Sequence, residues 1–267
     1  LIGQALKQGS KRDKAIISVK FGGQRGPDGH FVGYATDRAA TRTALAYTLK
    51  RLRVDYIDIY RPARVAPNIP IEDTVGAIAE MVKEGYVRHI GLSEAGVDTI
   101  RKAHAVHPIV DLQIEYAILT RGVEDKILPV LRELGIGMTA YGVLSRGLIS
   151  DSALAGGSRS GFRSMAPRFQ GENLDRNLAL VQALKNIATE KGCTVAQLAI
   201  AWVSARGQDI VPLIGARKPA RLAEALQALD VTLTPQDFAR IEAAAPVGSV
   251  AGERYPAAQT AMLDSER

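Results

Sequence analysis

Residues 52–94 read LRVDYIDIYRPARVAPNIPIEDTVGAIAEMVKEGYVRHIGLSE, which is a short apolar run, a helical pattern and a second apolar run. The β-branched and aromatic content of residues 56–60 indicates a buried strand. Residues 71–84 have apolar side chains at helical spacing, and Gly85 is a typical helix stop. Residues 90–92 form the next predicted strand. Strand, helix and strand in this order predict two parallel strands joined by a right-handed crossover.

The same alternation extends in both directions along the chain. Upstream, residues 15–20 predict a strand, and residues 38–52 predict a helix with Asp37 as its N-cap. The further predicted strands are residues 111–115, 137–141 and 209–213. The further predicted helices are residues 97–105, 122–134, 174–191, 194–205, 219–226 and 235–244. Residues 145–171 and the C-terminal tail, residues 247–267, have no assignable period.

Six predicted strands fit two architectures. An open doubly wound sheet accommodates six directly, whereas a closed (β/α)8 TIM barrel needs two more strands before Leu1. No G-x-G-x-x-G follows any predicted strand, which removes the usual dinucleotide signature of the open sheet. The pattern therefore favours a single α/β barrel domain over residues 1–267 with its first strands missing. Leu1 lies inside an amphipathic pattern without a cap, so we expect residues to precede it.

Composition excludes several classes of protein. The chain is 46% apolar and 23% charged, a profile typical of a soluble globular protein. No apolar run reaches membrane-spanning length, and we expect no membrane association. The net charge of +6 is spread among nearly as many acids, without a basic helix or zinc pattern, so nucleic-acid binding is not expected. The single cysteine, Cys193, on an apolar helix pattern, favours a reducing compartment, most simply the cytoplasm.

Chemistry in a barrel belongs to the C-terminal ends of the strands. Lys20 ends the first predicted strand, where burial would be costly unless a carboxylate pairs with it; a surface lysine is the alternative. Residues 215–221, with Gly215 and two arginines after the last strand, suit a phosphate at a helix N-terminus, although an exposed basic turn fits equally well. Tyr141 could offer its ring to a flat ligand or cap the core.

Five segments in the same order resemble the aldo-keto reductases, particularly bacterial members related to the β subunit of potassium channels. They are LIGQALK with RDKAIISVKFG (residues 1–22), the stretch 52–94, VDLQIEYAIL (110–119), GIGMTAYGVLSRGLIS (135–150) and VPLIGARKPARLAEAL (211–226). The resemblance implies a (β/α)8 barrel that reduces an aldehyde or ketone with NADPH and contains no metal.

The resemblance also implies roles for individual residues. Lys20 takes the position of the lysine that lowers the pKa of a tyrosine general acid. Ser93 and Gln113 take positions that bind the nicotinamide carboxamide, and Tyr141 the position that stacks on the nicotinamide ring. The pyrophosphate loop corresponds to residues 142–147, with Gly142, Leu144, Arg146 and Gly147. The adenosine 2′-phosphate site corresponds to Gly215, Ala216, Arg217 and Arg221, and Glu224 to an adenine contact. Residues 145–171 resemble the loop that covers the cofactor.

The departures from the family pattern are specific. The family's aspartate and tyrosine belong to a segment upstream of Leu1, and Ala63 stands where the family has its histidine. Glu94 replaces an asparagine, and so does Ala225. Of the four catalytic positions only Lys20 is filled. The role of the histidine would fall to water, to Arg61 or Arg64, or to a pocket residue; His30 is expected to be exposed.

Three hypotheses follow for this chain. The first is an NADPH-dependent reductase of small carbonyl compounds. The second is a catalytically impaired NADP(H)-sensing or partner-binding module on the same scaffold, suggested by Ala63. The third is that these residues alone form an inactive piece with unpaired strand edges. Neither the substrate nor the oligomeric state can be read from the pattern.

Overall fold

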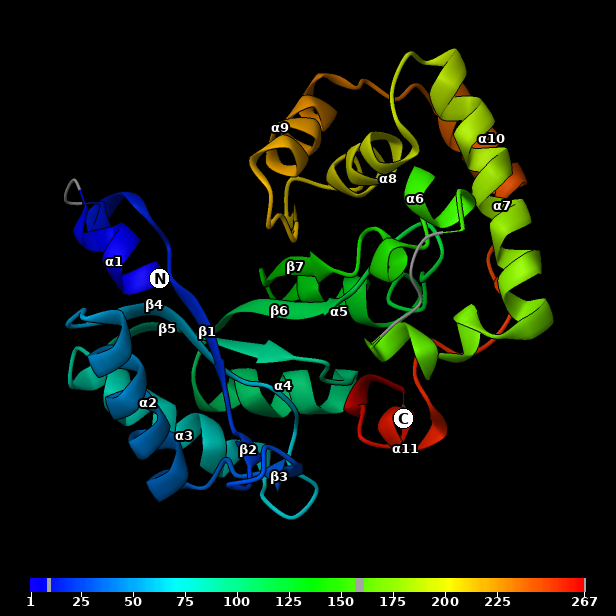
Figure 1. Ribbon diagram of the computed structural model, residues 1–267. Coiled ribbons are helices and arrows are strands. Elements are labelled where there is room, and N and C mark those ends of the chain that lie inside the picture. Colours follow the sequence, from blue (N-terminus) through cyan, green and yellow to red (C-terminus); the bar gives the residue numbers. More distant parts are fainter. Residues whose placement is uncertain (9–10, 157–160, 267) are drawn as a thin grey trace. The chain divides into compact units, whose positions relative to one another are not determined.

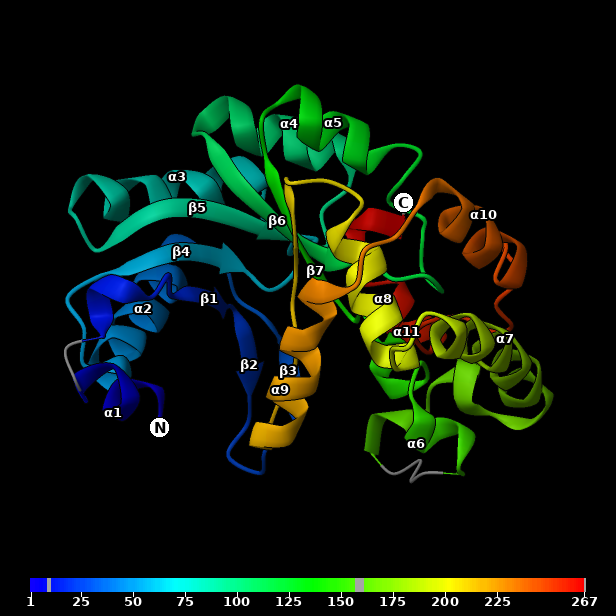
Figure 2. The same cartoon turned by 90° about the horizontal axis from the view of Figure 1, so that it is seen from above.

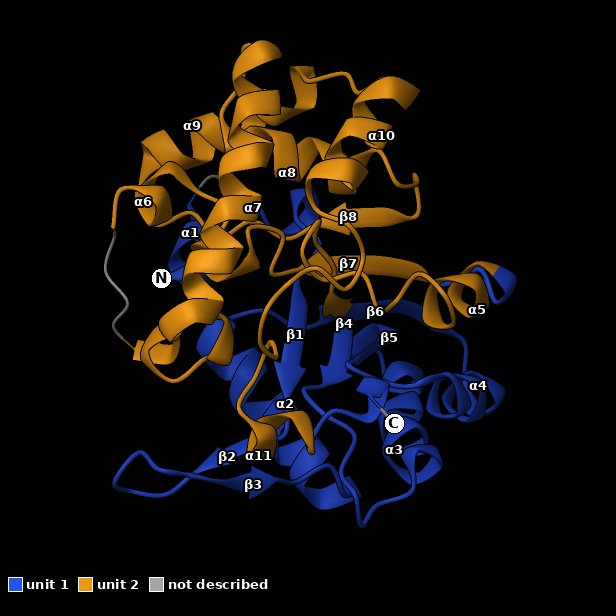
Figure 3. Cartoon of the chain, turned by 90° about the vertical axis from the view of Figure 1, so that its right-hand side faces the viewer, with its two compact units in different colours: residues 1–113, 133–136, 262–267 blue, residues 114–132, 137–261 orange. Residues whose placement is uncertain are grey.

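The computed structural model describes residues 1–8, 11–156 and 161–266 (Figure 1). Its main sheet is parallel, with hydrogen-bonded strands in the order β1-β4-β5-β6-β7-β8. The six predicted strands are thus confirmed. The chain divides into two compact units, coloured separately in Figure 3, which are described one at a time below. Unit 1 comprises residues 1–113, 133–136 and 262–267, and unit 2 comprises residues 114–132 and 137–261.

Unit 1 holds β1 and its neighbours in the parallel sheet. The strands are β1 (Ser18–Phe21), β4 (Ile57–Pro62), β5 (Val87–Ser93) and β6 (Ile109–Glu115), the last two residues of which belong to unit 2. Registers pair Lys20 with Arg61, and Ser93 with Gln113. The crossover helices are α2 (Arg38–Leu52), α3 (Ile71–Lys83) and α4 (Val97–Val106). They lie next to one another along the sheet in Figure 1.

Alternation along these strands gives the sheet of unit 1 two chemically different faces. On one face Tyr60, Ile90 and Leu92 are buried with the apolar sides of the helices. Because the side-chain period of a strand is two, Lys20 and Arg61 belong to the opposite face. Polar side chains of several strands therefore share one surface, although the residues around them read as apolar runs.

Unit 2 begins with the end of β6 and continues the βα alternation. Its main elements are α5 (Ile127–Glu133), β7 (Gly137–Tyr141), α7 (Gly171–Glu190), α8 (Val195–Ser204), β8 (Ile210–Pro212), α9 (Pro219–Gln227) and α10 (Pro235–Ala244). Figure 2 shows α8 between α9 and α7. Trp202 of α8 is buried against Tyr116, as expected for a core residue.

Sequence patterns missed some local structure. The expected loop at residues 22–37 contains a hairpin, β2 (Gly23–Arg25) with β3 (Phe31–Tyr34), whose strands are too short and exposed to show a period. Its exposed turn carries His30, bonded to Asp28. Helix α5 starts later than predicted, after turns over residues 122–126. Cys193 lies in the bend between α7 and α8, not on a helix.

Where the structure describes them, the two stretches without a period contain short helical turns. They are η2 (Ser145–Gly147), α6 (Asp151–Leu154), η3 (Gly161–Ser164) and η4 (Pro167–Phe169), then α11 (Ala257–Thr260) and η6 (Asp264–Glu266) in the tail. Residues 157–160 and 267, within the expected covering loop and tail, lie outside the described residues. Among the helices that the structure does describe, none has the length and apolarity to cross a bilayer.

Candidate functional site

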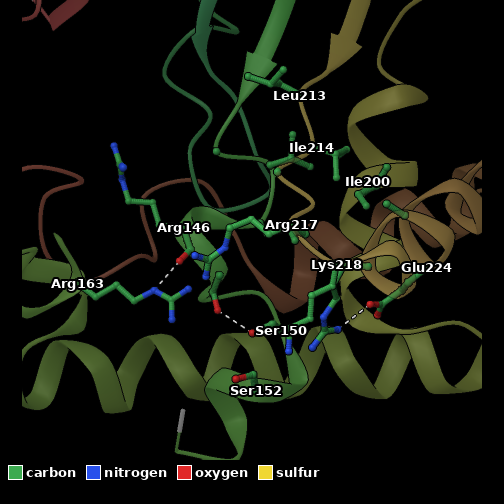
Figure 4. A pocket seen from close by; sticks show the side chains of 17 residues that line it. Arg146, Ser150, Ser152, Arg163, Ile200, Leu213, Ile214, Arg217, Lys218 and Glu224 are labelled. Carbon is green, nitrogen blue, oxygen red and sulfur yellow. Dashed lines mark hydrogen bonds and ion pairs between the residues drawn. The ribbon is translucent and has the colours of Figure 1, made fainter. Parts of the chain in front are cut away.

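Unit 2 contains a pocket of about 540 Å³ built from two distant segments (Figure 4). One wall is the loop after β7, and another is the turn after β8 with the first part of α9. Residues predicted for the pyrophosphate loop, for the 2′-phosphate site and for the adenine contact thus line one cavity. They are Gly142, Leu144, Arg146, Gly147, Gly215, Arg217, Arg221 and Glu224.

The loop after β7 contains several residues with positive φ. Gly142 has φ +69° and packs against Glu115, where a Cβ atom would lie 3.0 Å from the Cγ atom of Glu115. Glycine is needed there for both reasons. Ser145 and Arg146 also have positive φ, 46° and 57°, which costs on the order of 1–3 kcal/mol each. Non-glycine residues held in this region are common where a ligand is bound.

Arg163 comes from the expected covering loop and closes over the β7 loop. Its Nε atom donates to the carbonyl oxygen of Arg146 at 2.8 Å, as Figure 4 shows. Its guanidinium occupies the space where a side chain on Gly147 would begin, so glycine at position 147 is required for this contact. The described part of the covering loop is therefore fastened directly to the predicted pyrophosphate loop.

The turn after β8 carries the other cations of the pocket. Arg217 and Lys218 precede Pro219, the first residue of α9, and Arg221 donates to Glu224 at 2.7 Å. The second carboxylate oxygen of Glu224 accepts from Thr194 at 3.1 Å, which fixes the carboxylate at the pocket wall. Ala216, predicted with this group, is exposed and does not line the cavity.

The charge of this pocket is strongly unbalanced. Five cationic side chains line it, Arg146, Arg163, Arg217, Lys218 and Arg221, against the single carboxylate of Glu224. Arginines favour phosphates because their guanidinium can donate two parallel hydrogen bonds. The cavity can therefore bind a ligand with more than one phosphate group.

Tyr141 ends β7 and is half-buried beside this loop. Its hydroxyl is 2.9 Å from the hydroxyl of Tyr255, a residue of the C-terminal tail. Tyr141 does not line the pocket of 540 Å³. Tyr255 was not anticipated from the sequence, because the tail has no pattern from which its path could be read.

In unit 1, Lys20 is the next to last residue of β1 and faces solvent, not a closed core. Of the two alternatives that the sequence left open, the structure agrees with the surface lysine, because Lys20 lies on the polar face of the sheet and Phe21 on the apolar one. Partial desolvation of its ammonium is the largest cause that lowers the pKa of Lys20, and the positive charges of Arg64 and Arg61 lower it further. The negative charge of Glu94 raises it. A lysine in this setting is a candidate for acid-base chemistry.

Arg61 and Asp111 form an ion pair on the same polar face. Arg61 is fully buried and also donates to the hydroxyl of Ser18. Burial lowers the pKa of Arg61, and the charge of Asp111 opposes that shift. Sequence reasoning offered Arg61 as a substitute for the missing histidine. The ion pair instead occupies its guanidinium within the sheet.

Ser93 and Gln113 are neighbours in β5 and β6 and both are buried. The Ser93 hydroxyl is buried without a hydrogen-bond partner among the described residues. A buried hydroxyl without a partner is costly, and a ligand amide would satisfy it. The Ser145 hydroxyl and the Arg146 Nε atom of unit 2 are in the same condition. In each unit by itself, a polar ligand would satisfy these groups.

Glu94 follows β5 and is completely buried with φ 53°, a left-handed conformation that asparagine tolerates better than glutamate. Its carboxylate accepts from the Ser265 hydroxyl at 2.9 Å, and its carbonyl oxygen from the Ser265 amide. The last turn of the chain therefore holds the loop that follows Ser93.

Ala63 lies just beyond β4, where its amide donates to the carbonyl oxygen of Phe21 at 2.8 Å. Arg64 is half-buried and donates to the carbonyl oxygen of Ala63 at 2.7 Å. Within the described residues no carboxylate pairs with Arg64. Nor do those residues contain a group of three or more histidine, cysteine or acidic side chains placed to hold a metal ion.

Comparison with known proteins agrees with this description. The model of the Aldo/keto reductase family matches residues 1–246. A curated relative from Glycine max, named "Probable aldo-keto reductase 1", is 44% identical over 258 residues, which are 96% of this chain and 73% of the relative.

Two solved structures are also similar. One is a glycerol dehydrogenase from Gluconobacter oxydans, with a TM-score of 0.81 and 25% identity over 91% of this chain and 75% of the other. The other is a thermostable aldo-keto reductase in complex with the inhibitor epalrestat, with a TM-score of 0.72 and 26% identity over 91% and 76%. The fold class of this chain is that of their (β/α)8 barrel.

Proposed function

Because this chain belongs to the aldo/keto reductase family, an oxidoreductase family that acts on small carbonyl compounds, we propose that it reduces an aldehyde or ketone with NADPH. The observation that carries the choice of NADPH is the cluster of cations in the pocket of unit 2. A phosphate dianion on the adenosine ribose would form charge-assisted hydrogen bonds with Arg217, Lys218 and Arg221. The ribose hydroxyl of NADH at the same place carries no charge for them to pair with.

Cofactor contacts are proposed for each unit by itself, at the positions that the family resemblance assigns. In unit 2, Arg146 and the amides of the β7 loop would bind the pyrophosphate, and the Tyr141 ring would lie on the nicotinamide. In unit 1, the hydroxyl of Ser93 and the amide of Gln113 would bind the carboxamide. The unsatisfied hydroxyl of Ser93 supports this assignment.

When bound, the cofactor supplies a hydride at the C4 atom of the nicotinamide. Lys20 would place its ammonium beside the general acid, which in the family is a tyrosine, and would stabilise that tyrosine as it loses its proton. The neighbouring positive charges that lower the pKa of Lys20 would act in the same direction on a tyrosine hydroxyl.

Arg64 would take over the hydrogen bond that the family's histidine makes to the substrate oxygen. Of the two arginines near Ala63, Arg61 is buried in its ion pair with Asp111, whereas Arg64 bonds only the adjacent backbone carbonyl within the described part of the chain. A guanidinium would orient and polarise the carbonyl oxygen but, unlike histidine, would not exchange a proton in the neutral pH range.

The experiment that tests this function is titration of NADPH against the fluorescence of Trp202, the single tryptophan, with NADH as the control. We expect saturable quenching by NADPH and at least ten-fold weaker binding of NADH. The absence of NADPH binding would overturn the proposal. A panel of aldehydes and ketones is then tested for oxidation of NADPH by absorbance.

Ala63 favours one second candidate, a module that binds NADP(H) without turning over a substrate. NADPH binding together with no turnover across the carbonyl panel would select this module over the reductase. A reducing compartment such as the cytoplasm is part of the proposal, on the strength of the single cysteine.

A further inference from the structure

The C-terminal tail is fastened to unit 2 at one point of close backbone contact. The buried side chain of Asn177 on α7 accepts from the Ala251 amide at 2.8 Å and donates to the Ala251 carbonyl oxygen at 2.9 Å. The next residue, Gly252, has φ +80°, and a Cβ atom there would lie 2.9 Å from the backbone of Pro167. Only glycine allows this approach.

This anchor directs the following side chains inward. Arg254 and Tyr255 are both buried, although they belong to an irregular segment near the end of the chain. The Arg254 guanidinium lies 3.4 Å from the Glu115 carboxylate. Tyr255 places its hydroxyl 2.9 Å from that of Tyr141.

Tyr255 also contacts the loop expected to bind the pyrophosphate. The Arg146 guanidinium lies 4.7 Å from the centre of the Tyr255 ring and 4.1 Å from that of Phe162, and the two rings meet edge to face at 5.6 Å. The Nε atom of Arg146 is buried and has no partner among the described residues. Tyr255 is therefore the one side chain that touches both Tyr141 and Arg146 in this set of contacts.

We propose that Tyr255 is a positioning residue for the dinucleotide cofactor. Its hydroxyl holds the tip of the Tyr141 side chain and so fixes where that ring lies, and its face holds the Arg146 guanidinium in place. One residue of the tail thereby sets both how the nicotinamide lies and how the pyrophosphate is bound. The inference rests on the proposed function, since it takes Tyr141 and Arg146 as cofactor contacts.

The physical reason is the freedom that each partner would otherwise have. A tyrosine side chain at the end of a strand swings about its Cα–Cβ bond between rotamers, and a hydrogen bond at its tip restricts that swing. An arginine held over aromatic rings is already restricted to few rotamers before a ligand binds. The loss of side-chain entropy on binding is therefore smaller. Preorganised contacts of this kind act on binding and on geometry together.

The test compares Tyr255→Phe, Tyr255→Ala and Tyr141→Ala, with Tyr116→Phe as the matched control. Tyr116→Phe removes another buried hydroxyl of unit 2, bonded to Glu124 at 2.6 Å and to Arg206 at 3.0 Å, away from the pocket lining. For each variant we would measure the NADPH dissociation constant and the fluorescence anisotropy of the bound reduced nicotinamide. A third measurement is transfer of deuterium from the two stereoisomers of 4-deuterated NADPH.

For Tyr255→Phe we expect the dissociation constant to rise about three-fold, as for the loss of one hydrogen bond. The anisotropy should fall, because the Tyr141 hydroxyl loses its bond to position 255 while Arg146 stays covered. Tyr255→Ala should weaken binding about ten-fold or more and transfer some deuterium from the opposite face. Tyr116→Phe should change none of these quantities even if it lowers the melting temperature.

If Tyr141→Ala weakens NADPH binding while both Tyr255 variants match the unmodified protein, the inference fails and the proposed function survives. If the unmodified protein binds no NADPH, the proposed function fails and this inference with it. A folded Tyr255→Phe variant suffices for the decision if Tyr255→Ala does not fold.

Discussion

Arg61 reaches Asp111 across Gly91, because the strand between their two strands has no side chain at that point. A Cβ atom on Gly91 would lie 3.3 Å from the Arg61 Nε atom and 3.0 Å from the carbonyl oxygen of Asp111. The ion pair and the glycine are thus one feature of the polar face of unit 1. It occupies the Arg61 guanidinium within the sheet.

Substitution of Gly91 by alanine should lower stability by about 1–3 kcal/mol, because the added methyl group crowds a closely packed sheet. Valine should cost more. Urea denaturation of the whole protein would measure the change in its free energy of unfolding. Gly76→Ala is the control, since a Cβ atom there meets nothing within 4 Å, and an equal loss in the two variants would contradict this explanation.

Arg217→Ala should raise the dissociation constant of NADPH about ten-fold and leave that of NADH nearly unchanged. The reason is that a charge-assisted bond to a phosphate is worth about 1.4 kcal/mol or more. Calorimetric titration of both cofactors measures the ratio. Arg240→Ala, which removes an arginine of α10 paired with Glu190, is the control. Equal weakening of both cofactors would argue against a 2′-phosphate at Arg217.

Glu94→Gln should move the alkaline limit of the activity profile to lower pH. The carboxylate of Glu94 raises the pKa of Lys20, so removing its charge leaves only the influences that lower it. Lys20 then loses its proton, and its effect on the general acid, at a lower pH. The rate of NADPH oxidation against pH gives the limit. An unchanged or raised limit would show that Lys20 does not control it.

Arg64→Gln should reduce kcat about 100-fold with little change in NADPH binding, as expected when a donor to the reacting oxygen is lost. Adding Ala63→His to that variant should recover part of the activity. It should also introduce a pH dependence near neutrality, because histidine titrates there. Arg88→Gln removes another cation of unit 1, stacked on Tyr56, and should leave kcat unchanged. Activity of Arg64→Gln equal to that of Arg88→Gln would exclude the proposed role.

Local patterns in the sequence determined the order and type of the elements. The cap at Asp37 and the stop at Gly85 are short-range signals, and the helices α2 and α10 were predicted with the bounds that the structure has. The ordered family segments determined the class of enzyme and the two loops that meet in the cationic pocket. These features depend on residues a few positions apart, which is why they can be read from the chain.

The tertiary structure alone decided which side chains face one another. Arg61 could have served the substrate as well as Arg64 until the pairing of three strands placed it over Gly91 against Asp111. The tail had no pattern, and its contacts in unit 2, the bonds to Asn177 among them, bring Tyr255 to Tyr141 and Arg146. Contacts between residues so far apart in the chain depend on strand register and on backbone approach at single glycines, and neither has a local signature in the sequence.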